Sequence, residues 1–338
     1  MTQMTRPATE RRKATSTGTD AETDAGQQDS AETHAGQQDS AESGAQTQSQ
    51  AQTSNPARTV PTRRMSFEES MRDLPRHFAG DGDLISGHLI AALSSVFPDG
   101  EDYFVRSVRH FRDQVTDPAL KRQVSGFIGQ EAVHGREHRV FNDRLAELGY
   151  PTKHYETLTR VALRFRERIL SAKSNLAATA ALEHFTATLA ELVLSSEEVR
   201  TEMGADAVRD LFVWHALEES EHKAVAFDVY RAVGGGERLR VWTMNFFRFG
   251  FVAGMAAAVG ISLLGDPATY RPGTLRRSWR KVRRSPIMGR AVWAQLRDYN
   301  RPDFHPDDSD TTELVEAWRA ELFGEHGTLK NKLIGAAA

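Results

Sequence analysis

Apolar side chains recur every three or four positions along much of the chain after residue 64, which is the spacing of a helix with one buried face. One such stretch runs from Gly100 to Gln114, and the two residues Gly100 and Glu101 are expected to open it. Its apolar stripe includes Phe104 and Phe111. No strand-length run alternates between apolar and polar residues. The pattern therefore predicts an all-α fold.

Three further helices follow from the same spacing and from residues that typically begin or end helices. Asp117 and Pro118 are typical of an N-cap and a first helical position, and we expect their helix to run to Leu148. Further helices are expected over residues 157–195 and 206–233, the last one ended by three consecutive glycines. The sequence thus predicts four long helices in this part of the chain.

The composition divides the chain into three parts. Residues 1–64 are rich in Thr, Ser, Gln, Ala, Gly and Asp and contain a near-duplicated segment of ten residues. A segment with so few large apolar side chains cannot offset the entropy lost on ordering, so we expect a disordered low-complexity tail. Residues 65–235 are expected to form the helical bundle. Residues 236–338 are expected to form a C-terminal helical extension packed on that bundle.

The extension combines a hydrophobic segment with a basic one. Residues 249–264 contain no charged side chain, but sixteen residues are fewer than the roughly 20 that span a bilayer as a helix. Residues 271–290 then carry eight Lys or Arg and no acid. Two interpretations stay open: packing on the bundle with a solvated basic face, or peripheral contact with an anionic membrane through residues 241–290.

The overall composition narrows the chemistry. The 338 residues carry a net charge of -3, which gives no whole-chain argument for nucleic-acid binding. The absence of Cys excludes disulfides, thiolate metal sites and Cys nucleophiles. The first twenty residues lack the apolar core of a secretory signal, so a cytoplasmic protein, possible membrane association included, is expected. Any metal must rest on oxygen and nitrogen ligands.

One chemical motif occurs twice, 88 positions apart. Glu131 and His134 lie three residues apart in one predicted helix, as do Glu219 and His222 in another. Residues at this spacing share a helix face, so each motif can direct a carboxylate and an imidazole toward one point. Together with one inward Glu from each of two other helices, this is the pattern of the carboxylate-bridged two-metal site in ferritin-like four-helix bundles.

The two additional carboxylates are chosen by their order along the chain. Glu101 precedes the first motif, and Glu183 lies between the two motifs. Glu191 could replace Glu183 only if the helix register were shifted by two turns. His184 points about 100° away from Glu183 and is expected to pack or to support the site. His138 shares the face of the first motif and is another candidate for a supporting role.

Spacing also separates candidate ligands from their neighbours in the last helix. His215, Glu219 and His222 fall within about 60° of one another around the helix axis. Glu218 and Glu221 lie further from this stripe, so we expect them to support the ligands and regard them as tentative catalytic residues. Four Glu would neutralise the charge of about +4 on two divalent ions. The expected cofactor is a pair of iron ions, with manganese as the alternative.

Several stretches of the chain resemble a bacterial family described as predicted metal-dependent hydrolases. They include GQEAVHGREHRVFN, WHALEESEHKAVAFDVY and RPDFHP, and the resemblance spans roughly residues 75–310. The spacing around His215 is also similar to that of di-iron arylamine N-oxygenases, which have an additional His ligand one turn before the last motif. His138 has no ligand role in that comparison, and His305 is expected to cap or pack. The resemblance implies these ligands: Glu101, Glu131, His134, Glu183, His215, Glu219 and His222.

Three functions are consistent with these features. The first is an O₂-dependent di-iron oxidase or oxygenase that acts on an apolar small organic substrate. It would take electrons from a separate donor protein, since no nucleotide-binding motif is found. The second is a hydrolase in which two metals activate a water molecule, with Glu218 or Glu221 as candidate base. The third is a non-catalytic, iron-binding ferritin-like protein.

Overall fold

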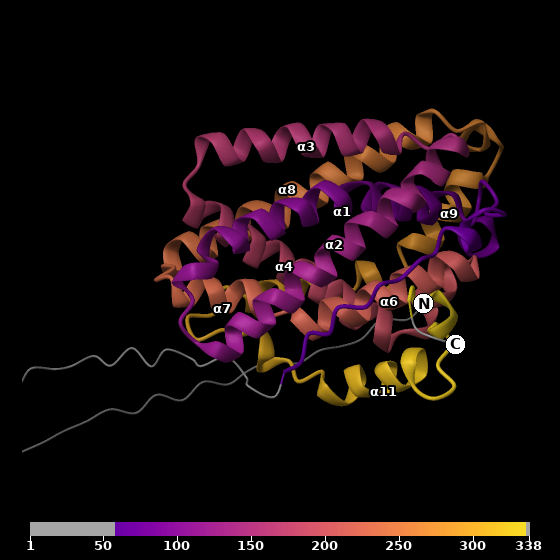
Figure 1. The fold of residues 1–338 in the computed structure, drawn as a ribbon. Coiled ribbons are helices and arrows are strands. Elements are labelled where there is room, and N and C mark those ends of the chain that lie inside the picture. Colours follow the sequence, from indigo (N-terminus) through magenta and orange to yellow (C-terminus); the bar gives the residue numbers. More distant parts are fainter. Residues whose placement is uncertain (1–57, 336–338) are drawn as a thin grey trace, which may run out of the picture. The chain divides into compact units, whose positions relative to one another are not determined.

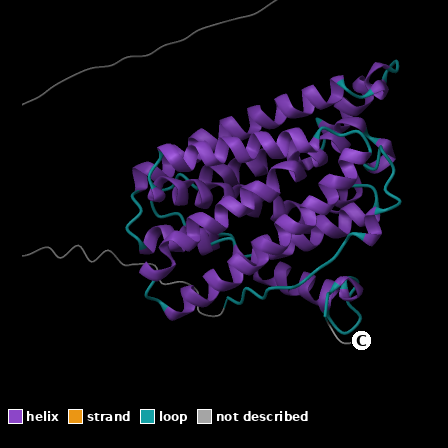
Figure 2. Cartoon of the chain, turned by 45° about the horizontal axis from the view of Figure 1, so that its top comes forward, coloured by secondary structure: helices purple, strands orange, loops and turns teal. Residues whose placement is uncertain are grey.

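The computed structural model of the chain describes residues 58–335, and most of these residues are helical. Figure 2 shows helices joined by loops. Within the described range there is no strand, and extended pairing is limited to one bridge between Met65 and Leu333. The predicted all-α fold is therefore confirmed. The predicted disordered tail lies outside the described residues as far as residue 57.

Four helices carry the seven candidate metal ligands. Helix α1 packs against α2, and α4 packs against α6. Because α1 also touches α4 and α2 touches α6, the contacts among the four helices form a closed ring (Figure 1). The four are α1 (Leu84–Phe111), α2 (Pro118–Glu147), α4 (Ala172–Ser195) and α6 (Asp206–His222).

Other helices pack on the outside of this ring or continue it. Helix α3 contacts α1 and α2, α8 contacts α1 and α4, and α11 contacts α6. Helix α9 contacts α1, and α10 contacts α4. The bounds are α3 (Thr152–Ile169), α5 (Glu197–Glu202), α7 (Val225–Ala232), α8 (Glu237–Leu264), α9 (Thr274–Val282), α10 (Arg290–Asp298) and α11 (Thr312–Phe323).

The predicted start of the first helix near Gly100 is wrong. Helix α1 begins at Leu84, where the Asp83 side chain caps it by accepting a hydrogen bond from Ser86 N. Pro98 lies inside the helix although it lacks a backbone N–H. The extra turns place Glu101 in the interior of a long helix instead of at an exposed end. In contrast, the predicted helix from Asp117 and Pro118 is confirmed, with both residues in their expected roles.

Two other predicted helices are each divided in the structure. The expected helix over 157–195 is α3 followed by α4, because Leu170 is extended and the Ser171 side chain caps α4 by accepting from Ser174 N. The expected helix over 206–233 is α6 followed by α7, with the break at Lys223 and Ala224. The breaks leave α4 and α6 free to take their own directions beside α1 and α2.

Two apolar clusters form the core, and both reach the candidate ligands. Trp214 belongs to the first cluster, and its ring centroid lies 4.9 Å from that of His134. Phe127 belongs to the second cluster, and its ring centroid lies 5.0 Å from that of His222. These aromatic walls restrict the room around the imidazoles and exclude water from the interior.

Residues 58–64, which we call the N-terminal strap, lie directly on α2. A Cβ atom added to Gly126 would lie 2.1 Å from Val60 O, and one added to Gly129 would lie 2.1 Å from Thr62 Oγ1. The two glycines therefore let the strap approach the helix more closely than any other residue would. Gln130 Nε2 also donates a hydrogen bond to Pro61 O at 3.0 Å.

Candidate metal centre

The structure brings the seven predicted ligands together in one buried region. One comes from α1, two from α2, one from α4 and three from α6. None is more than 3% exposed. Buried ionisable groups of this number need partners or metal ions to offset their desolvation. In chain order they are Glu101, Glu131, His134, Glu183, His215, Glu219 and His222.

The donor atoms form three overlapping groups. Within each group, one atom from each of three residues lies within 4.8 Å of the others. Because Glu131 and His134 each belong to two groups, the groups are neighbours within one centre. This overlap is what a carboxylate-bridged pair of ions requires. The groups are Glu101, His134 and His215; Glu131, Glu183 and His222; and Glu131, His134 and Glu219.

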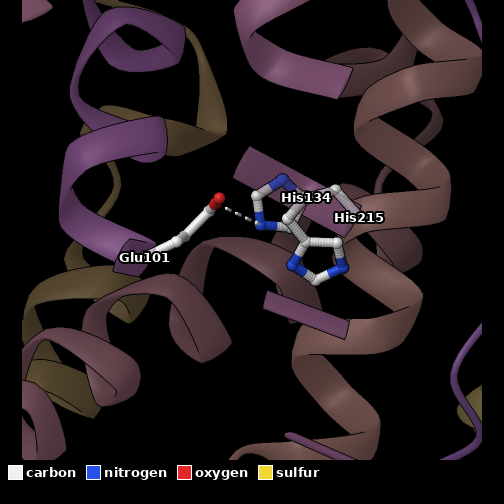
Figure 3. Close-up of side chains that lie close together, drawn as sticks. All are labelled: Glu101, His134 and His215. Carbon is white, nitrogen blue, oxygen red and sulfur yellow. Dashed lines mark ion pairs between the residues drawn. The ribbon is translucent and has the colours of Figure 1, made fainter. Parts of the chain in front are cut away.

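The first group shows how residues from three helices converge. Glu101 of α1 points toward the imidazoles of His134 and His215, which come from α2 and α6 (Figure 3). The two rings stack with their centroids 4.1 Å apart. Glu101 Oε1 lies 3.6 Å from His215 Nε2. A carboxylate and two imidazoles therefore face a common point without a hydrogen bond between Glu101 and either ring.

Each imidazole is held by a partner outside the ligand set. His134 Nε2 lies 3.0 Å from Glu218 Oε2, which leaves Nδ1 toward the centre. His222 Nδ1 lies 2.8 Å from Gln130 Oε1, which leaves Nε2 toward the centre. Such partners fix the tautomer and orientation of metal-binding histidines in proteins.

The third imidazole is held by another histidine. His215 Nδ1 lies 2.7 Å from His138 Nε2, and His138 Nδ1 lies 2.8 Å from Ser94 Oγ. Ser94 in turn donates to Asn142 Oδ1 at 2.6 Å. The other ring nitrogen of His215 lies 2.9 Å from Glu219 Oε1, within the centre. His138 thus occupies the supporting position expected of it, and it links His215 to a buried polar chain.

The donor atoms fit metal ions because most of them have no other hydrogen-bond partner. Both carboxylate oxygens of Glu101, Glu131 and Glu183 are buried without a hydrogen bond. The same holds for one atom each of Glu219, His134 and His222. An unsatisfied buried polar atom costs roughly 1–3 kcal/mol. His222 Nε2 lies 3.0 Å from Glu131 Oε1, so part of this set is an ion pair between candidate ligands, and the nine atoms together are consistent with a metal site.

The electrostatics of the candidate centre also suit positive ions. Burial and neighbouring carboxylates raise the pKa of Glu101 and of Glu183 well above the usual range. Burial opposes ionisation of Glu219 as well, but His222 and His215 hold the pKa of Glu219 well below its usual range. Positive ions in the centre would favour the ionised form of all three carboxylates.

The two tentative catalytic residues lie outside the ligand groups. Arg63 Nη1 donates to Glu218 at 2.9 Å, and Arg63 Nη2 donates to Glu221 at 2.7 Å. Glu221 also accepts hydrogen bonds from Gln130 at 2.8 Å and from Arg319 at 2.6 Å. Glu218 and Glu221 therefore position His134 and, through Gln130, His222.

The remaining candidates occupy places away from the centre. Glu191 accepts a hydrogen bond from Ser309 Oγ at 3.0 Å, so Glu183 and not Glu191 points into the centre. His184 Nε2 donates to Gln295 O at 2.9 Å, and His305 Nε2 lies 2.8 Å from Asp228. Both histidines pack around Phe227, Tyr299 and Phe304.

Sequence reasoning missed two supporting residues, Gln130 and Arg63. Gln130 belongs to no motif, and its role depends on the approach of α6 to α2. Arg63 lies in the segment assigned to the tail, where composition gives no sign of order. The weak signal for Arg63 is its position two residues before buried Met65, at the point where apolar residues begin to recur.

Two apolar cavities adjoin the centre. One, of about 270 Å³, includes Glu101 in its lining, and the other, of about 100 Å³, includes His215 and Glu219. Leu93 and Phe97 line both cavities, so the two lie next to each other beside the candidate ligands. Such a lining suits an apolar molecule held against a polar reactive group.

Comparison with known proteins gives one match. Residues 61–310 match the family described as predicted metal-dependent hydrolase. The matched range includes all seven candidate ligands and also Arg63, Gln130 and His138. No curated protein and no solved structure matches the chain.

Proposed function

The chain belongs to the predicted metal-dependent hydrolase family, and we propose that it is a dinuclear metalloenzyme that acts on an apolar organic substrate. The observation that carries this proposal is the cluster of buried donor atoms without hydrogen-bond partners, contributed by four helices. Its position beside two apolar cavities supports an enzymatic role over a purely structural one.

The proposed architecture of the centre is that of a ferritin-like bundle. The ring of contacts among α1, α2, α4 and α6 supports it, as does one Glu each from α1 and α4. The other two helices each supply a Glu and a His three residues apart. His215 adds a seventh ligand one turn before Glu219.

The chain's own residues would prepare the centre for chemistry in three ways. Glu218, Gln130 and His138 hold the three imidazoles in fixed orientations. The apolar lining excludes water and places an apolar substrate next to the ligands. When bound, a pair of metal ions would supply either redox chemistry with O₂ or Lewis-acid activation of water.

Two reaction classes fit such a centre, and different observations favour them. Hydrolysis is favoured by the description of the family. Oxidation by O₂ is favoured by the apolar cavities and by the engagement of Glu218 and Glu221 with Arg63, which leaves neither carboxylate as an available base. We therefore propose hydrolysis, which the family description supports, and O₂-dependent oxidation with electrons from a separate donor as the two candidate reactions.

The two candidates can be separated with protein purified without oxygen and loaded with Fe(II). Metal content per chain is measured first, followed by O₂ consumption and the visible spectrum after rapid mixing with O₂. Two irons per chain with rapid O₂ consumption would support the oxidase. Two metals with O₂-independent cleavage of lipophilic esters would support the hydrolase. Failure to bind stoichiometric metal would overturn both candidates, and uptake of many irons per chain would indicate storage.

A further inference from the structure

Helix α8 presents a large apolar surface to its surroundings. By length and composition it could cross a membrane, and it is the one described helix that meets this test. Trp242, Phe249 and Leu264 on its outer side are between 62% and 68% exposed. The helix nevertheless packs along α1 and α4. It therefore lies along the protein surface with one apolar side unpartnered.

Helix α3 carries a second outward apolar stripe. Leu158, Val161, Phe165 and Ile169 recur at intervals of three or four residues, which places them on one side of the helix. Each is between 59% and 67% exposed. A stripe with this spacing normally faces a protein core, so its exposure requires another explanation.

The two helices that carry these stripes touch each other at two places. The Tyr155 hydroxyl of α3 donates to Ala258 O of α8 at 2.6 Å, and the Arg166 guanidinium of α3 lies 5.5 Å from the Phe247 ring centre of α8. The contacts pair the start of α3 with the later part of α8, so the helices run antiparallel (Figure 1). We call the outer sides of α3 and α8 the apolar face.

Five arginines on α3 and on the segment after α8 have no ion-pair partner among the described residues. Arg164 and Arg168 flank the stripe on α3, while Arg271, Arg276 and Arg283 follow α8 in the chain. All five side chains are exposed, and none makes an ion pair within the described part of the chain. A face of this composition complements an anionic lipid surface.

One acidic residue near α9 is paired on the other side of that helix. Lys281 pairs with Asp81 at 3.2 Å, and Arg277 lines a polar hollow together with Glu197 and Glu198. The outer side of α9 instead exposes Trp279, which is 54% exposed and lies between arginines. Tryptophan next to arginine is typical of helices that lie in a membrane interface.

A cavity connects the apolar face with the candidate metal centre. The 270 Å³ cavity is lined by residues of both α3 and α8, including Leu163 and Phe251. Leu158 also lines it and is 67% exposed, whereas Glu101 lines it and is 1% exposed. The cavity therefore extends from the surface between the two helices to a predicted ligand.

We propose that the apolar face rests on an anionic lipid bilayer and that the cavity admits an apolar, membrane-dissolved substrate to the metal centre. The substrate route rests on the proposed function, whereas the bilayer contact does not. The arginines of α3 and α9 would contact lipid phosphates while the stripes enter the acyl region. A symmetric dimer through this face would bring the same unpaired arginines together, which disfavours a second copy as the occupant.

Bilayer contact is tested by flotation of the full-length protein with phosphatidylcholine vesicles, with and without phosphatidylglycerol. We expect binding to the anionic vesicles and at least tenfold weaker partition for Phe165→Glu with Phe249→Glu, and for Arg276→Glu with Arg283→Glu. Lys121→Glu with Arg122→Glu removes two exposed positive charges from α2 and should leave binding unchanged. Circular dichroism verifies that every variant is folded.

Three results would overturn the bilayer contact. One is absence of binding to anionic vesicles. Another is an equal loss of binding in the α2 variant, which would indicate unspecific attraction to charge. The third is that the protein does not bind vesicles but forms a dimer, and that Phe165→Glu with Phe249→Glu dissociates this dimer. That result would identify the face as a protein interface.

The substrate route is tested with vesicles that contain a diazirine-labelled fatty acid. Illumination should attach the label to peptides of α3 and α8 that line the cavity. Ala162→Trp should reduce labelling there severalfold because Ala162 lines the cavity, whereas Ala320→Trp on exposed α11 should not. Labelling confined to the outer stripes would overturn the route. Metal content separates the two proposals. Normal loading without vesicle binding overturns only this inference, whereas vesicle binding without metal overturns the proposed function and the substrate route but not the bilayer contact.

Discussion

At the scale of single residues, the centre combines groups that would destabilise the fold in the absence of a compensating charge. Four buried glutamates lie beside three buried histidines, and six oxygens of Glu101, Glu131 and Glu183 have no hydrogen-bond partner. Core residues of similar volume but without charge would be easier to bury. The arrangement is therefore best explained by the ions it can hold, and the ligand residues should matter more for metal binding than for folding.

Glu131→Ala or Glu219→Ala should abolish binding of two metals while the far-UV circular dichroism stays largely unchanged. Glu131 belongs to two donor groups, and Glu219 lies between His215 and His222, so neither can be lost without opening both ion positions. Metal content per chain is the measurement. Glu147→Ala, at an exposed position of the same helix as Glu131, should bind two metals. Normal loading of both ligand variants would contradict the assignment.

Asp266 offers a test of electrostatics far along the chain from the ligands. Although burial opposes it, the backbone hydrogen bond from Ala268 and the side chains of His77 and Arg76 lower the pKa of Asp266 to about 2. A carboxylate with a lowered folded-state pKa contributes stability above its unfolded pKa of 3.8 and loses that contribution as the pH falls toward 2. Asp266 should therefore stabilise the fold at neutral pH and not in strong acid.

Asp266→Asn should lower the free energy of unfolding by about 2 kcal/mol at pH 7. The deficit should shrink as the pH is lowered below about 4, because protonation of the wild-type carboxylate removes the same charge. Urea unfolding of both proteins across this pH range measures the difference. A deficit that stays constant down to about pH 3 would mean that shape and packing, not charge, explain the effect of the substitution.

At the scale of helices, periodicity predicted where helices occur but not where they break. The N-cap at Asp117 could be predicted because an N-cap depends on residues that are adjacent in the sequence. The break at Leu170 was not, because the surrounding residues favour helix and only Ser171 marks a new start. The predicted opening of a helix at Gly100 is wrong because α1 continues through Pro98 and Gly100, where tertiary packing holds it.

The candidate ligands could be predicted from the sequence more readily than the residues that hold them in place, for a related reason. The spacing Glu-x-x-His places both residues on one face of a helix, and this placement depends only on local helix geometry. Gln130, by contrast, supports His222 only because α2 and α6 approach each other. Arg63 supports Glu218 only because the strap crosses α2. Contacts between elements that are distant in the chain do not produce a periodic pattern in the sequence, so periodicity cannot predict them.

The strap gives a prediction at this scale. Deleting residues 1–57 should leave metal loading and thermal stability unchanged, whereas deleting residues 1–64 should weaken both. The longer deletion removes Arg63, which leaves buried Glu218 without a guanidinium partner and Glu221 with Arg319 alone. Thermal unfolding and metal content of the two truncated proteins are the measurements.

A substitution in the helix beneath the strap provides a check that keeps the full chain. Gly129→Leu should displace the strap, because a Cβ atom there would already lie 2.1 Å from Thr62 Oγ1. This variant should show the same losses of metal loading and thermal stability as the deletion of residues 1–64. Gly250→Leu, at an exposed position of α8 where a Cβ atom would meet nothing within 4 Å, serves as the matched control. Equal behaviour of the two truncations would show that the strap has no role in supporting the centre.

At the scale of the whole molecule, metal binding and folding should be coupled. The seven ligands come from four helices that are linked into one ring of contacts, so ions at the centre would join all four. An ion that binds only the folded chain stabilises it by about 4 kcal/mol when present at a thousandfold excess over its dissociation constant. For a domain of this size, that corresponds to a rise in the unfolding temperature on the order of 10 °C.

Fe(II) or Mn(II) should therefore raise the unfolding temperature of chelator-treated protein by roughly this amount, and chelation should reverse the rise. Mg(II) should have a smaller effect because it prefers oxygen ligands and three of the seven donors are imidazoles. In Glu131→Ala the rise should disappear, since Glu131 belongs to two of the three donor groups. Calorimetry without oxygen measures all three. A metal-dependent rise that persists in Glu131→Ala would place the stabilising ions elsewhere, and the proposed centre would then lose its main support.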